Sequence, residues 1–131
     1  MRKFDLKLDK YGISRYAYRE LLNFCLQYPD KKLQLEGMYG PRAVNLTGMP
    51  GGGDVSDPTA QTAIRTGRLR DDVEAIEAAA KEADEAIAPY ILRNVTTGMS
   101  WERMDVPCGI NQFYMLRRKF FYILAAKKGM L

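Results

Sequence analysis

The chain has 131 residues, of which 47% are hydrophobic and 27% charged, a composition typical of one ordinary globular domain rather than a disordered chain. It contains no histidine, and its two cysteines, Cys25 and Cys108, stand far apart. Imidazole-based catalysis, a zinc site and a disulfide framework are therefore not indicated. No apolar run is long enough to span a membrane, and the first residues lack the apolar core of a signal peptide. We therefore expect a cytoplasmic protein.

Charge is distributed unevenly along the chain. Residues 110–131 carry five basic residues and no acid, whereas residues 70–88 carry seven acids and two bases. The C-terminal region can therefore meet phosphate, and the middle region would repel it.

The N-terminal segment, residues 1–36, is expected to be helical. Tyr18, Leu21, Leu22 and Cys25 recur at helical spacing after Ser14, which is a suitable N-cap. The helix should stop near Pro29. Residues 30–38 either form a second short helix capped by Asp30 or continue the first helix beyond a kink.

Residues 37–56 are rich in glycine and proline and are expected to form a flexible loop between the helical parts. The triplet Gly51-Gly52-Gly53 resembles part of a phosphate-binding loop. No Lys-Ser/Thr pair follows it and no strand precedes it, so a linker is the better interpretation.

Residues 57–131 are expected to hold a long acidic helix followed by a helix-turn-helix. Asp57 and Pro58 are good start signals, Gly67 is a weak point, and Pro89 must kink the helix or start another. Apolar residues then recur every three or four positions, as in a heptad seam. The seam either packs within the chain or joins copies into a homo-oligomer. Its members are Leu69, Val73, Ile76, Ala80, Ala83, Ile87 and Tyr90.

The last quarter of the chain has the pattern of a DNA-reading helix-turn-helix. A supporting helix should end at Gly98 in a left-handed cap, and Ser100 should cap a short helix through Met104. Residues 105–109 would make the turn, and Asn111 would cap a final helix reaching Lys128.

The final helix is expected to have two faces. Phe113, Leu116, Phe120 and Leu124 share one side, which should pack on the preceding helices. Asn, Gln and Arg side chains on the other side suit base edges, whereas Lys suits phosphate. Arg117 lies nearer the apolar side, where it would contact a phosphate or pair with an acid of the bundle. The expected DNA-binding residues are Asn111, Gln112, Tyr114, Met115, Arg117, Arg118, Lys119 and Tyr122.

Three segments together resemble small phage-encoded transcriptional regulators of the RinA/ArpU type. They are "YRELLNFCLQYPDKK", "SDPTAQTAI" after the glycine-rich stretch, and "VPCGINQFYMLRRKFFYIL". The resemblance implies a helix-turn-helix similar to sigma-factor region four, with its recognition helix at residues 111–122. It also implies action on phage or prophage late genes in a bacterial cytoplasm, with double-stranded DNA and host RNA polymerase as candidate partners.

These features favour an all-α helical bundle that binds DNA sequence-specifically as a regulator, without cofactor or metal. Two alternatives remain: a DNA-packaging subunit of the small-terminase kind, motivated by the seam, and a helical protein-interaction module. An enzyme is the least favoured class. Asp71-Asp72 or Glu82-Asp84-Glu85 would be the acids of a magnesium site, but a solvated helix surface explains them better.

Overall fold

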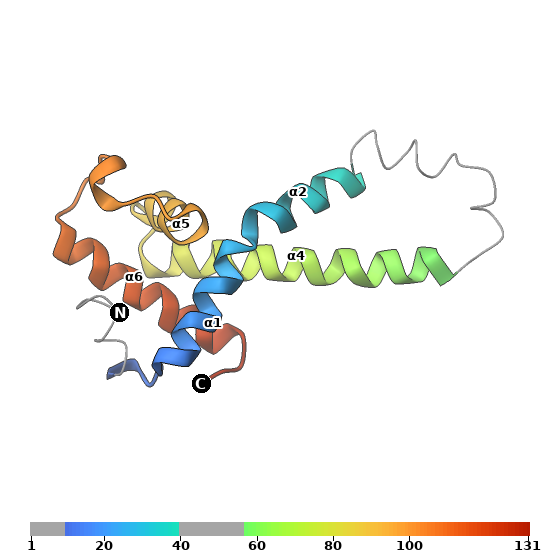
Figure 1. Cartoon of the computed structure of the whole chain (residues 1–131), viewed down its shortest axis with the longest axis horizontal. Coiled ribbons are helices and arrows are strands. Elements are labelled where there is room, and N and C mark those ends of the chain that lie inside the picture. The colour runs from blue at the N-terminus through green and yellow to red at the C-terminus, as the bar shows by residue number, and fades with distance from the viewer. Residues whose placement is uncertain (1–9, 40–56) are drawn as a thin grey trace. The chain divides into compact units, whose positions relative to one another are not determined.

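The computed structural model describes residues 10–39 and 57–131, and no strand occurs in these two ranges. The expected all-α class is confirmed (Figure 1). The glycine- and proline-rich residues 40–56, with the glycine triplet, lie outside the described residues. The elements are α1 (Arg15–Leu26), α2 (Tyr28–Tyr39), α4 (Asp57–Ala83), α5 (Ala88–Thr97), the 3-10 helix η3 (Trp101–Arg103) and α6 (Ile110–Lys127).

Helix α1 begins and ends as its sequence predicts. The Ser14 hydroxyl accepts a hydrogen bond from the Ala17 backbone N–H at 3.1 Å and so satisfies one of the unpaired donors of the first turn. The helix ends at Leu26 with Gln27 as C-cap. Pro29, in the first turn of α2, has no N–H to continue the α1 hydrogen-bond ladder. The chain therefore starts a second helix at Tyr28, two residues before the expected cap Asp30.

Helix α4 begins at Asp57, runs through Gly67 without a break and stops at Ala83. The end is set by Asp84, whose Oδ1 accepts from the Ile87 backbone N–H at 3.0 Å and whose backbone carbonyl accepts from the Ala88 N–H at 2.9 Å. Pro89 then lies in the first turn of α5, where a missing N–H costs nothing. Of the two outcomes expected at this proline, a new helix is the one adopted.

The chain divides into two compact units. Unit 1 comprises residues 1–27 and 75–131, and unit 2 comprises residues 28–74. In unit 1, helices α1, α5 and α6 pack against one another in pairs (Figure 1). Three phenylalanines of α6, Phe113, Phe120 and Phe121, are fully buried there. The Phe121 ring meets the Phe120 and Tyr18 rings edge to face, with centroids 5.1 and 5.2 Å apart.

Unit 2 is a helical hairpin with polar contacts between its two helices (Figure 1). Lys31 Nζ lies 2.9 Å from Asp72 Oδ2, and Arg65 donates to Gln34 Oε1 at 2.9 Å. Because the earlier residue of α2 contacts the later residue of α4, the two helices are antiparallel. Leu33 and Ile64 are 67% and 58% exposed.

The seam predicted in the acidic region packs within the chain rather than between copies. Val73, Ile76, Ala80, Ala83 and Ile87 are all buried in the single chain, while Leu69 is half-buried. The expectation that this seam joins copies is therefore wrong, because its side chains are already covered. Ile87 also lies beyond the end of α4. None of the helices in the described part of the chain has the length and apolar content needed to cross a bilayer.

Candidate nucleic-acid interface on α6

The helix that supports α6 ends at the predicted glycine. Gly98 is the C-cap of α5 with φ 79°, and its N–H donates to the Asn94 carbonyl at 2.9 Å. Glycine reaches this left-handed conformation without a steric penalty. The Asn94 side-chain amide donates to the Met99 carbonyl at 2.9 Å and so ties the following residues to the helix end.

The short helix expected before the turn is only one turn of 3-10 helix, η3, and the Ser100 side chain makes no capping hydrogen bond. A connection from Gly98 to Gly109 therefore separates α5 from α6, longer than the tight turn that the sequence suggested. The Trp101 indole N–H donates to the Cys108 carbonyl at 3.1 Å and closes this connection on itself. Asp105, with φ 52°, adopts a left-handed conformation that aspartate tolerates better than most residues.

Helix α6 starts two residues earlier than expected. Its N-cap is Gly109, which offers no side-chain hydrogen bond, so Asn111 lies inside the first turn and is not the cap. The Asn111 side chain is exposed to solvent and does not cap the helix.

The packing face of α6 is confirmed. Phe113, Phe120 and Leu124 are fully buried and Leu116 is 7% exposed. The buried surface extends further round the helix than this one stripe, however. It also takes in the aromatic side chains of Tyr114 and Phe121.

Arg117 is held inside the bundle, where it is 7% exposed. Its Nε donates to Asn94 Oδ1 of α5 at 2.7 Å, and one terminal nitrogen donates to the Tyr18 hydroxyl of α1 at 3.1 Å. The guanidinium carbon also lies 4.9 Å from the centroid of the Phe121 ring. Planar guanidinium groups combine hydrogen bonding and ring stacking in this way, so Arg117 joins α1 and α5 to α6.

Three of the predicted DNA-binding residues do not lie on an accessible surface. Tyr114, Arg117 and Arg118 are 6%, 7% and 9% exposed. The expectation that Arg118 faces outward is wrong, and so are the expectations that Tyr114 contacts DNA and that Arg117 reaches a phosphate. Helical periodicity correctly gives the angle of each side chain about the α6 axis. The buried part of the α6 surface is wider, however, than that of a helix that packs with one face only.

The remaining five predicted residues form one exposed strip along α6, which we call the α6 stripe. Met115 and Tyr122 are 47% and 43% exposed, and the others are also exposed. At 3.6 residues per turn all five fall on one side of the helix. The α6 stripe consists of Asn111, Gln112, Met115, Lys119 and Tyr122.

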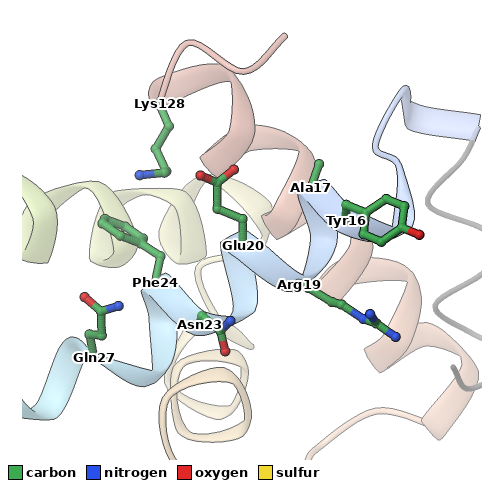
Figure 2. A pocket seen from close by; sticks show the side chains of 8 residues that line it. All are labelled: Tyr16, Ala17, Arg19, Glu20, Asn23, Phe24, Gln27 and Lys128. Carbon is green, nitrogen blue, oxygen red and sulfur yellow. The ribbon is translucent and has the colours of Figure 1, made fainter.

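The two lysines at the end of α6 are engaged with neighbouring helices. Lys127 Nζ lies 2.5 Å from Glu82 Oε2 of α4. Lys128 Nζ lies 3.7 Å from the centroid of the Phe24 ring of α1. Figure 2 shows Lys128 above a shallow groove of about 730 Å³ whose other lining residues all come from the α1 region, among them Tyr16, Arg19 and Glu20. The groove is open to solvent, is lined by polar and apolar side chains alike, and has Arg19 and Lys128 as its basic residues.

Little chemistry is built into the described residues. Cys25 is buried and Cys108 half-buried, and both are free thiols. Burial, with a smaller contribution from the Asp84 carboxylate, raises the pKa of the Cys108 thiol, so it is a poor nucleophile at neutral pH. Among the residues that the structure describes, no cluster of three or more Cys, Asp or Glu side chains is arranged to hold a metal ion.

Two positioning residues, Asn94 and Trp101, have roles that sequence reasoning did not assign. Asn94 bonds to both α6 and the connection after α5, and the Trp101 indole fixes the turn before α6. The only sequence signal was the presence of polar atoms on residues at the ends of helices.

Comparisons of the chain with family models, with characterised proteins and with solved structures gave no match.

Proposed function

We propose that this protein is a sequence-specific DNA-binding transcriptional regulator, of phage or prophage origin, that reads the duplex with the α6 stripe. The observation that carries the proposal is the stripe itself: an acid-free strip of amide, thioether, ammonium and phenol groups on a helix anchored by its opposite face. The resemblance of the chain to RinA/ArpU-type regulators supports the same function.

The residue types of the α6 stripe match the chemistry of a major groove. Asn111 and Gln112 can each form paired hydrogen bonds with adenine, and the Met115 side chain can contact a thymine methyl group. Lys119 suits a phosphate or guanine. Anchoring by the buried phenylalanines keeps the α6 backbone rigid, so binding has only to order the exposed side chains of the stripe.

The burial of two arginines alters the expected character of binding. Lys119 is the one cation of the α6 stripe, so we expect fewer phosphate contacts than a five-cation helix would make. Each phosphate neutralised contributes about 0.9 to the slope of log affinity against log salt. The affinity should therefore come mainly from amide contacts with bases, and it should fall only weakly as the salt concentration rises.

The test is selection of bound duplexes from a random pool, followed by titration of the selected duplex with variants. Asn111→Ala should weaken binding by roughly 1–3 kcal/mol and relax the preference at one base position. Lys119→Ala should weaken all sequences alike and reduce the salt slope by about 1. Arg19→Ala, which removes an exposed cation on α1, is the matched control. A chain that selects no sequence and shifts no duplex at low salt would refute the proposal.

A second candidate, a protein-interaction module, is favoured by the exposure of Met115 and Tyr122. Methionine and tyrosine are enriched in protein interfaces, and a stripe with one charge also suits a protein partner. This alternative predicts that Met115→Ser and Tyr122→Ser abolish capture of a specific host protein while duplex binding is undetectable in the unaltered chain.

A further inference from the structure

One face of α4, beside the Arg65 and Asp72 side chains that contact α2, carries an unusual combination of side chains. Ile64, Arg68 and Asp71 follow one another at spacings of four and three residues, so they share one side of the helix. All three are exposed, and Ile64 is 58% exposed. Thr66 and Val73 lie on the opposite side and are buried.

The charged residues of α4 change from basic to acidic between Arg70 and Asp71. Arg65, Arg68 and Arg70 precede the boundary, and Asp71, Asp72 and Glu74 follow it. On the face that carries Ile64, Arg68 and Asp71, this change of sign makes α4 complementary to a second copy laid antiparallel, because Arg68 of each copy then faces Asp71 of the other. A parallel alignment would place like charges opposite each other.

We propose that this face of α4 docks against the same face of a second copy of the chain, with the two α4 helices antiparallel. A two-fold axis crossing α4 between Leu69 and Arg70 places Arg68 of each copy opposite Asp71 of the other. The same axis places the exposed Ile64 opposite Ala75, which lies on the same side of α4 and is half-buried. The contact is isologous, with the two ion pairs flanked by two apolar contacts.

The proposed surface lies on the side of α4 away from buried Val73, and three of its four side chains, Ile64, Arg68 and Asp71, are exposed. Exposed ion pairs contribute little individually, and the apolar area at Ile64 and Ala75 is small. The dimer is therefore weak and salt-sensitive. It requires nothing of the α6 stripe, so its test is independent of duplex binding.

Sedimentation equilibrium of the full chain at low and high salt tests the proposal with charge reversals. The unaltered chain should dimerise, with a dissociation constant that increases with salt. Arg68→Asp and Asp71→Arg should each raise this constant about tenfold or more, because repulsion replaces both symmetry-related pairs. An equimolar mixture of the two variants should dimerise again, since each introduced charge meets its opposite across the axis.

Two further variants separate docking from folding. Ile64→Ser should weaken the dimer without changing the helical circular dichroism, because the side chain is exposed. Arg19→Asp on α1 is the matched charge control and should leave the dimer intact. The proposal would be overturned if the unaltered chain were a monomer at low salt or formed a ring of many copies. It would also be overturned if Arg68→Asp dimerised as strongly as the unaltered chain, or if the mixture of the two charge-reversed variants stayed monomeric.

Discussion

The two units of this chain are stabilised in different ways. Unit 1 places large aromatic side chains such as Phe113 and Phe120 at full burial between α1, α5 and α6. Among the side chains that the structure describes in unit 2, only Thr66 and Val73 are buried, and Leu33 and Ile64 are exposed. The α2 and α4 segments of unit 2 are joined by polar contacts instead. A helical region with exposed apolar residues and paired polar ones is suited to association, whereas unit 1 is suited to holding α6 rigid.

The largest expected effect is in the unit 1 core. Phe120→Ala should lower the free energy of unfolding by about 3–5 kcal/mol, because it removes buried apolar area and leaves a cavity. Urea denaturation followed by circular dichroism measures it. Lys119→Ala on the exposed side of the same helix is the control and should cost about 0.5 kcal/mol or less. Equal losses in the two variants would contradict the division of α6 into core and surface.

Arg117→Ala should have the next largest effect. Removing the guanidinium leaves Asn94 Oδ1 and the Tyr18 hydroxyl without this donor inside the bundle, at a cost of about 2–3 kcal/mol. Arg93→Ala, which removes an exposed arginine of α5, should change stability by less than about 0.5 kcal/mol. If Arg117 were instead a surface phosphate contact, its loss would lower duplex affinity and leave the denaturation midpoint unchanged.

A smaller effect is expected at the end of α5. Gly98 has φ 79°, so Gly98→Ala should cost about 1 kcal/mol through backbone strain. Gly109, with φ −70° and open space around an added Cβ, provides the comparison. Gly109→Ala should lower stability by at most a few tenths of a kcal/mol, roughly, because its φ suits alanine although alanine is a poorer N-cap than glycine. The melting temperatures of both variants measure the difference. A larger decrease for Gly98→Ala would show the cost of the left-handed conformation, whereas equal decreases would show only the loss of a glycine.

The smallest effects are expected in unit 2. The Lys31 and Asp72 side chains are 13% and 36% exposed, so Lys31→Ala should cost about 0.5–1 kcal/mol after allowance for solvent screening. Leu33→Ala should cost less still, because its side chain is 67% exposed. Hydrogen exchange provides the regional measurement, with α2 amides expected to exchange faster than those of α6. Slower exchange in α2 would remove the contrast between the units.

The sequence by itself determined where several elements begin and end. Ser14 capping α1, the stop before Pro29 and the left-handed glycine after α5 are local effects, set by a few neighbouring residues and their backbone preferences. The apolar face of α6 was also predictable, because helical periodicity fixes which side chains share a side. Periodicity also placed the five members of the α6 stripe on one side of the helix, together with Arg118, which the structure shows to be buried.

Tertiary structure alone decided how much of α6 is covered. Periodicity gives the angle of Arg117, Arg118 and Tyr114 about the helix axis, but it does not give the number of elements packed around that helix. Contacts with α1 and α5 cover α6, and two of the five cations of the C-terminal region are enclosed. The choice at Pro89 was local instead, since Asp84 bonds to residues three and four positions later and starts a new helix rather than a kink. Local preferences thus set the helices, whereas the packing between them determined which of their charges reach solvent.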